Sequence, residues 1–282
     1  MMHVPEWGTT GVGSLPFTDV DVAVEHVLSA YEIPFCPQLP RLEGDMITEW
    51  LGADPSRCGW SPARDRERPR AWDALLARLE SGPARVVKLQ VTGPVTLAHA
   101  LGEGLPVASE LAVWLAANAG AQVRELAERG HDALLIVDEP ALHLLGPVDA
   151  VWDPLRACAP AWGLHLCGPV PWDVVARAEP DVLSFDLALA AVDGEAAETL
   201  RTLLARGTRV MWGAIQPHRP EHALHGMARL HAAVTATGAT GEQSLLSASC
   251  GSGQMPVGRE REIAAALRDC ATARRRLGMS RA

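Results

Sequence analysis

The sequence predicts an α/β protein built as one (β/α)8 barrel, the TIM-barrel fold, in a single domain over residues 1–282. Eight short β-prone runs alternate with longer helical stretches from one end of the chain to the other. Most of these runs are continuously apolar, which is typical of parallel strands that are buried on both faces. An open doubly wound sheet is the alternative, but neither a Gly-x-Gly-x-x-Gly turn nor a phosphate loop follows the first strand.

The strands are predicted from short aliphatic and β-branched runs that are bounded by turn residues. They are expected at residues 9–13, 33–38, 84–91, 133–137, 162–166, 181–185, 209–212 and 244–247. The second strand, 33–38, is the weakest of them because it carries two prolines.

The helices are predicted from apolar residues at helical spacing between the strands. They are expected at residues 19–31, 45–51, 71–79, 95–101, 108–129, 172–178, 195–205, 221–235 and 259–277. Gly207 follows the helix at 195–205 and is a favourable cap for its C-terminus. A proline- and arginine-rich excursion at 54–70 interrupts the alternation after the second helix.

Composition and charge narrow the class of protein. Apolar residues make up 48% of the chain and can fill a sizeable core, and the net charge of −9 argues against a surface for nucleic acid or anionic membrane. No apolar run reaches the length of a transmembrane helix, and the first ten residues lack a signal-peptide pattern, so we expect a cytoplasmic protein.

Lys88 is the only lysine beside many arginines, which we attribute to genomic base composition.

The six cysteines are expected to be thiols or metal ligands, because disulfides are rare inside cells. Cys158 and Cys270 are expected in helices of the core, and Cys36 is expected to pack after the second strand. Cys58 lies in the excursion and has no assigned role.

Polar and metal-binding residue types accumulate where the predicted strands end. In a (β/α)8 barrel the active site lies at the carboxyl ends of the strands. The side chains at these ends are Ser14, Gln90, Asp138, Glu139, His165, Cys167, Asp186, Gln216, His218 and Cys250. Because the strand bodies are largely apolar, this accumulation predicts one active site at that end of the barrel.

His165 and Cys167 are two residues apart at the end of one predicted strand, so both side chains can point to the same face. A thiolate and an imidazole together suit zinc better than magnesium or calcium. Asp186 and Cys250 can complete a tetrahedral set. The alternatives are a buried thiol beside a hydrogen-bonded histidine, a helix N-cap at Asp186 and an ordinary loop thiol at Cys250.

Five short motifs are spread over nearly the whole chain. They are Val-Gly-Ser-Leu-Pro at 12–16, Val-Thr-Gly-Pro-Val-Thr at 91–96, Val-Asp-Glu-Pro-Ala-Leu at 137–142, His-Leu-Cys at 165–167 and Cys-Gly at 250–251. In these motifs and their order the sequence resembles the C-terminal catalytic barrel of the cobalamin-independent methionine synthase family, in particular its short single-barrel relatives. The resemblance implies a zinc-dependent thiol methyltransferase of methionine biosynthesis on a (β/α)8 barrel.

The resemblance implies a zinc site in this chain. His165, Cys167 and Cys250 fall on zinc ligands of the family. Asp186 falls where the family has a glutamate ligand and is one methylene shorter than that residue. Asp186 or a water molecule is expected to hold the fourth position and to yield it to the substrate sulfur during catalysis.

The resemblance also implies a homocysteine site. Ser14 matches a residue that holds the homocysteine carboxylate, and Asp138, with Glu139 beside it, matches a residue that holds the amine. Glu43 is the nearest, though offset, counterpart of a second glutamate that binds homocysteine. His218 matches a proposed proton donor to the departing folate nitrogen.

Two methyl donors are compatible with these features. The family's N-terminal barrel, which helps to bind the polyglutamate tail of folate, has no counterpart here, which favours a methylcorrinoid or a methyl-carrier protein. The match of His218 favours 5-methyltetrahydrofolate.

Three other functions compete with methionine formation. A methyltransferase of the same superfamily could act on another thiol, such as coenzyme M, although coenzyme M lacks an amine for Asp138. Uroporphyrinogen decarboxylase shares the barrel but needs no zinc. A non-catalytic barrel could hold a structural zinc, but such sites usually have a closed cysteine-rich set.

Overall fold

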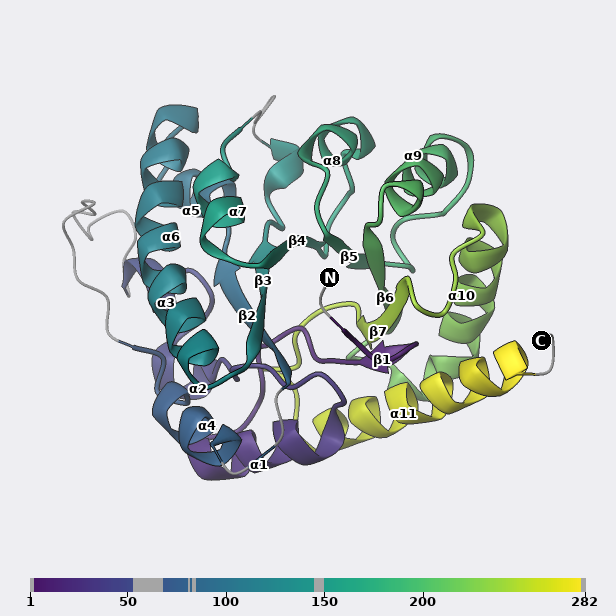
Figure 1. Ribbon diagram of the computed structural model, residues 1–282, viewed down its shortest axis with the longest axis horizontal. Coiled ribbons are helices and arrows are strands. Elements are labelled where there is room, and N and C mark those ends of the chain that lie inside the picture. Colours follow the sequence, from purple (N-terminus) through teal and green to yellow (C-terminus); the bar gives the residue numbers. More distant parts are fainter. Residues whose placement is uncertain (1–2, 53–67, 81, 83–84, 145–149, 280–282) are drawn as a thin grey trace.

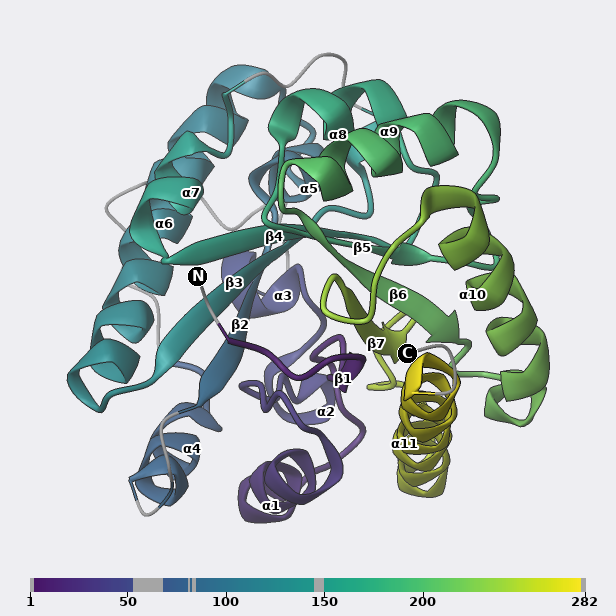
Figure 2. The same cartoon turned by 45° about the vertical axis from the view of Figure 1, so that its right-hand side comes forward.

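The computed structural model describes residues 3–52, 68–80, 82, 85–144 and 150–279. Seven parallel strands form one curled sheet in the order β1-β7-β6-β5-β4-β3-β2, and helices surround the outside of the curl (Figures 1 and 2). The strands are β1 (Gly8–Thr9), β2 (Val86–Thr92), β3 (Asp132–Asp138), β4 (Ala161–Leu166), β5 (Val182–Asp186), β6 (Arg209–Ile215) and β7 (Ser244–Ala248).

Helices connect successive strands, as predicted. They are α1 (Val20–Ala30), α2 (Pro40–Glu43), α3 (Thr48–Leu51), α4 (Trp72–Leu79), α5 (Pro94–Ala100), α6 (Leu105–Glu128), η2 (Leu142–Leu144), α7 (Asp153–Cys158), α8 (Trp172–Ala178), α9 (Gly194–Ala205), η3 (Pro220–His222), α10 (Ala223–Thr237) and α11 (Val257–Met279). Within the described ranges, no helix has both the length and the apolar character needed to cross a membrane. The excursion predicted at 54–70, with Cys58, lies outside the described residues apart from 68–70.

The predicted second strand, 33–38, is not a regular strand, but it closes the barrel between β1 and β2. On one side the Ile33 N–H donates to the Thr9 carbonyl at 3.0 Å, and on the other side the Cys36 N–H donates to the Lys88 carbonyl at 3.1 Å. The segment makes only isolated bridges because its two prolines have no N–H to donate. The predicted (β/α)8 architecture is therefore confirmed, with seven regular strands and this segment in second position.

The barrel interior and the helix layer have separate hydrophobic clusters. The inner cluster consists of alternate strand residues and two neighbours, namely Val4, Ile33, Val86, Leu134, Ile136, Ala161, Val182, Met211 and Leu245. Strand residues of the opposite parity, such as Leu135 and Trp212, pack in the larger cluster with the helices. Gly163 is needed inside because a Cβ there would lie 2.4 Å from the Val182 carbonyl oxygen.

Candidate active site

The inward faces of β2 to β5 change from apolar to polar toward their carboxyl ends. Side chains alternate along a strand, so residues two apart share a face. The inward polar residues are Lys88, Gln90, Thr92, Asp138, His165, Ser184 and Asp186, all of them buried. Thr92 pairs with Asp138, Asp138 with His165, and His165 with Ser184, so these side chains lie next to one another across the sheet.

His165 has one ring nitrogen bonded and the other without a partner. Nδ1 lies 2.8 Å from the Ser184 hydroxyl oxygen, whereas the buried Nε2 has no hydrogen-bond partner among the described residues. Burial, and then the positive charge of Lys88, lowers the pKa of His165 to about 3. The ring is therefore neutral at physiological pH, and with its proton on Nδ1 it presents a lone pair at Nε2.

The thiols of Cys167 and Cys250 meet at this end of the barrel, although they follow different strands, β4 and β7. The hydrogen bond between the two thiols lowers the pKa of Cys250 to about 7 and raises that of Cys167. The charge of Asp138 also acts on Cys167, and that of Asp186 acts on Cys250. Cys250 is exposed, so a molecule at the mouth of the barrel can reach it.

The donor types in this region fit zinc, although their present arrangement is not a formed site. No three His, Cys, Asp or Glu side chains in the described part of the chain are grouped so as to hold a metal ion. Two thiols in contact, beside a buried imidazole nitrogen without a partner, are nevertheless a donor set that suits zinc. Asp186 is a less clear candidate for a zinc ligand, because its Oδ1 already accepts a hydrogen bond from the Ala188 N–H at 2.7 Å in a local turn.

Asp138 is a buried carboxylate whose charge is opposed by a buried ammonium group. Its Oδ1 has no hydrogen-bond partner among the described residues. Burial raises the pKa of Asp138, and the Lys88 ammonium opposes that rise. The Nζ of Lys88 is fixed by the Val12 carbonyl at 2.8 Å and by the Gln90 side-chain oxygen, and it lies 5.1 Å from the centre of the Phe35 ring.

A chain of amides leads from Lys88 to a further acid, Glu49. Gln90 donates to the Gln38 side-chain oxygen at 2.7 Å, and Gln38 donates to Glu49 Oε2 at 2.7 Å. The charge of Glu49 also contributes to the raised pKa of Asp138, after the larger effect of burial. No sequence pattern indicated Glu49. Glu43, which was predicted as a homocysteine-binding glutamate, instead accepts a hydrogen bond from the backbone N–H of Arg70.

Glu139 does not have the substrate-binding position that was predicted for it. Its Oε1 accepts from the Val95 N–H at 3.1 Å and from the Trp152 indole at 3.0 Å, and its Oε2 accepts from the N–H and hydroxyl of Thr96. These donors fill the four acceptor positions of the carboxylate. Glu139 caps α5, and Gly93 is needed there because a Cβ would lie 2.0 Å from Glu139 Cδ.

Ser14 and His218 lie at the rim. Ser14 is half-buried beside the turn that follows β7, where its carbonyl accepts from the Ser252 N–H at 2.9 Å. His218 is exposed in the turn after β6, so its side chain is accessible to a molecule that approaches the mouth.

The sequence matches no family model and no curated protein. Among solved structures, it is similar to a B12-independent methionine synthase from Shewanella sp. W3-18-1 in complex with selenomethionine, with 15% identity and a TM-score of 0.68 over 98% of this chain and 100% of that one. It is also similar to a methyltransferase from Methanosarcina mazei, with 15% identity and a TM-score of 0.60 over 95% of each chain. The chain thus has the barrel fold of these two proteins.

Proposed function

We propose that this protein is a zinc-dependent methyltransferase that forms methionine from homocysteine. The observation that carries the proposal is the pair of contacting thiols, Cys167 and Cys250, at the same end of the barrel as two buried polar atoms without partners, His165 Nε2 and Asp138 Oδ1. Such atoms are costly to bury unless a ligand satisfies them. The fold shared with a methionine synthase and another methyltransferase supports the proposal.

His165, Cys167 and Cys250 would hold the zinc, with Asp186 as the candidate for a fourth, displaceable position. A bound zinc ion would lower the pKa of the homocysteine thiol, so that the nucleophilic thiolate forms at neutral pH. The exposed position of Cys250 supports a catalytic rather than a structural metal, because a structural site is closed to substrate.

The acidic groups of the site suit the ammonium end of an amino acid. Asp138 Oδ1 can accept from the homocysteine ammonium, and Glu49 adds a second negative charge nearby. Ser14, at the rim beside Gln38, would bind the carboxylate. Held at both groups, homocysteine would present its sulfur to the methyl donor in a fixed orientation, which favours an in-line transfer. These acids would repel the sulfonate of coenzyme M, which argues against that alternative.

Changing Asp138 to Asn is expected to weaken homocysteine binding by about 1.5–3 kcal/mol, the contribution of a hydrogen bond to a charged group. Zinc content should stay unchanged, because Asp138 is not one of the proposed ligands. Calorimetric titration with homocysteine measures the effect. Asp132→Asn, at the exposed start of the same strand, is the matched control and should bind as the wild type does. Unaltered affinity in Asp138→Asn would remove Asp138 from the site.

We propose a methylcorrinoid or a methyl-carrier protein as the methyl donor, rather than 5-methyltetrahydrofolate. The net charge of −9 does not attract a polyanionic glutamate tail. A corrinoid needs no acid at the leaving group, because the cobalt keeps the electron pair.

The test of the function and the donor is methionine formation from homocysteine with methylcobalamin and, separately, with methyltetrahydrofolate. We expect turnover with methylcobalamin and little with methyltetrahydrofolate, and His218→Ala should leave the methylcobalamin rate unchanged. No methionine from either donor would contradict the function. Efficient turnover with methyltetrahydrofolate that is abolished in His218→Ala would contradict the donor.

A further inference from the structure

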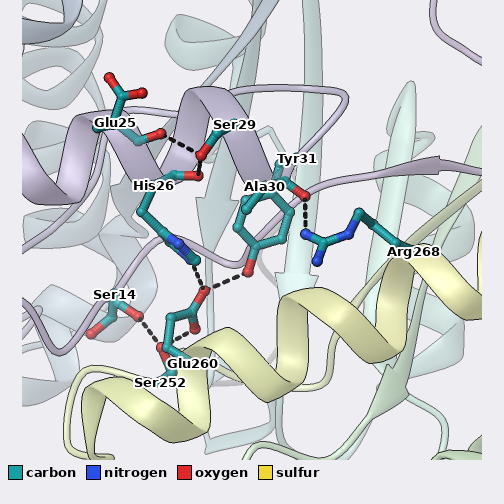
Figure 3. A network of polar contacts seen from close by, with 9 residues as sticks. All are labelled: Ser14, Glu25, His26, Ser29, Ala30, Tyr31, Ser252, Glu260 and Arg268. Atoms are coloured by element: carbon teal, nitrogen blue, oxygen red, sulfur yellow. Dashed lines mark hydrogen bonds and ion pairs between the residues drawn. The ribbon is translucent and has the colours of Figure 1, made fainter.

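A second buried carboxylate, Glu260 in the first turn of α11, contacts the turn that follows β7 and is only 2% exposed. Its Oε1 accepts from the Tyr31 hydroxyl at 2.6 Å and lies 3.0 Å from the ring Nε2 of His26, and its Oε2 accepts from the Ser252 hydroxyl. Figure 3 shows the carboxylate facing these three side chains. Glu260 thereby joins α1, the residue after α1 and the turn that follows β7.

Ser252 connects Glu260 to Ser14. Its backbone N–H donates to the Ser14 carbonyl at 2.9 Å, and its own carbonyl accepts from the Met255 N–H at 2.7 Å. The hydroxyl has one proton to donate, and Glu260 lies nearer to it than the Ser14 carbonyl, which is 3.3 Å away. The side chain of Ser252 is thus fixed by Glu260, and its backbone fixes Ser14.

The turn at 250–253 also packs directly on Ser14. A Cβ at Gly251 would lie 2.7 Å from Ser14 Cβ, and one at Gly253 would lie 2.1 Å from the Ser14 hydroxyl oxygen. With so little space between them, a displacement of Ser252 is expected to shift Ser14, and Cys250 lies in the same turn. These are the two residues that would hold the substrate carboxylate and the metal.

We infer that Glu260 is a positioning residue, which holds the turn at 250–253, and through it Ser14, in the geometry that binds the thiol substrate. The inference rests on the proposed function for the identity of that substrate. A carboxylate suits the role because its two oxygens can accept hydrogen bonds from all three neighbours. Glutamine at this position would direct an N–H₂ group at a donor, so at least one of these contacts would be lost.

Two substitutions break the hydrogen bond between Ser252 and Glu260, and a third substitution is the matched control. Glu260→Gln removes the charge, and Ser252→Ala removes the hydroxyl that reaches it. Tyr31→Phe also removes one donor to the same carboxylate, but from Oε1, and leaves the Ser252 contact on Oε2 intact. All three are expected to lower the melting temperature, so loss of stability alone does not distinguish them.

Two measurements separate positioning from stability. The first is amide hydrogen exchange of residues 250–255 in the metal-free protein, and the second is homocysteine affinity of the zinc-loaded protein by calorimetry. In Glu260→Gln and Ser252→Ala we expect exchange in this segment to be about tenfold faster and homocysteine binding to be about tenfold weaker, since small displacements of binding groups have large effects. Tyr31→Phe should match the wild type in both measurements.

Wild-type exchange in both variants would overturn the inference, as would equal effects in Tyr31→Phe. A different result would contradict the proposed function without contradicting the role of Glu260. Faster exchange in a protein that binds no zinc and methylates no homocysteine would contradict the proposed function while supporting the role of Glu260 in holding the turn.

Discussion

Replacing Cys167 or Cys250 with serine is expected to reduce bound zinc from about one ion per chain to a small fraction of that. A thiolate is a strong zinc ligand, whereas a serine hydroxyl stays protonated at neutral pH and binds zinc poorly. The two thiols are within hydrogen-bonding reach of each other, so each would supply one of at most four donors to the same ion. Elemental analysis of purified protein, after dialysis against a weak chelator, measures the loss.

Cys158→Ser is the matched control for these variants. Cys158 is a half-buried thiol of α7 that donates to the Leu155 carbonyl at 3.2 Å, a contact that serine can reproduce. We expect this variant to hold as much zinc as the wild type. Full zinc in both Cys167→Ser and Cys250→Ser would mean that the metal, if present, is held elsewhere.

Most strands could be predicted because buried parallel strands have continuous apolar sequences. β3 and β4 occur within one residue of their predicted bounds for this reason. The segment at 33–38 could not be assigned in the same way. Its prolines prevent a regular ladder, while its role in closing the barrel depends on hydrogen bonds to residues far away in sequence, such as Lys88.

The alternation of strand side chains explains why one of two adjacent acids points into the barrel and the other points away from it. Asp138 lies on the inward face with Ile136, and the barrel rule placed it at the mouth. Glu139 follows Asp138 by one residue and points the other way, toward α5. The sequence motif does not distinguish the two acids, whereas the alternation of side chains along a strand places them on opposite faces of the sheet.

The remaining site residues depend on long-range packing. Glu49 reaches the region of Asp138 through Gln38 and Gln90, and no local pattern specifies how 39–52 folds against β2. Lys88 could have been recognised from the sequence as a residue of the site, but we attributed it to base composition. A lysine at an inward position of an otherwise apolar strand must be buried with a partner, whatever the reason for the scarcity of lysine elsewhere.

Lys88→Met is expected to lower the free energy of unfolding by about 3–5 kcal/mol, the scale for removing one member of a buried charge pair. Methionine fills a similar volume, so the effect should come from charge and hydrogen bonds rather than from a cavity. The substitution leaves the Val12 carbonyl and the Gln90 oxygen without their donor, and leaves Asp138 without an opposing charge. Urea denaturation of the metal-free protein measures the change.

The pH dependence of this loss, together with a double variant, distinguishes electrostatics from packing. Burial raises the pKa of Asp138, and without the Lys88 ammonium it rises further in the folded state, whereas the unfolded chain keeps a carboxyl pKa of about 3.9. The pKa of Asp138 is already raised to about 8 in the folded wild type, so wild type and variant lose stability in parallel between about pH 4 and about pH 8. Above about pH 8 only the variant still holds the proton that the unfolded chain releases, so the deficit should be larger at about pH 9.5 than at about pH 5. Adding Asp138→Asn to Lys88→Met should restore a large part of the loss, because the two residues are coupled. A deficit that is equal at both pH values and unchanged in the double variant would mean that Lys88 acts through its hydrogen bonds to Val12 and Gln90 alone.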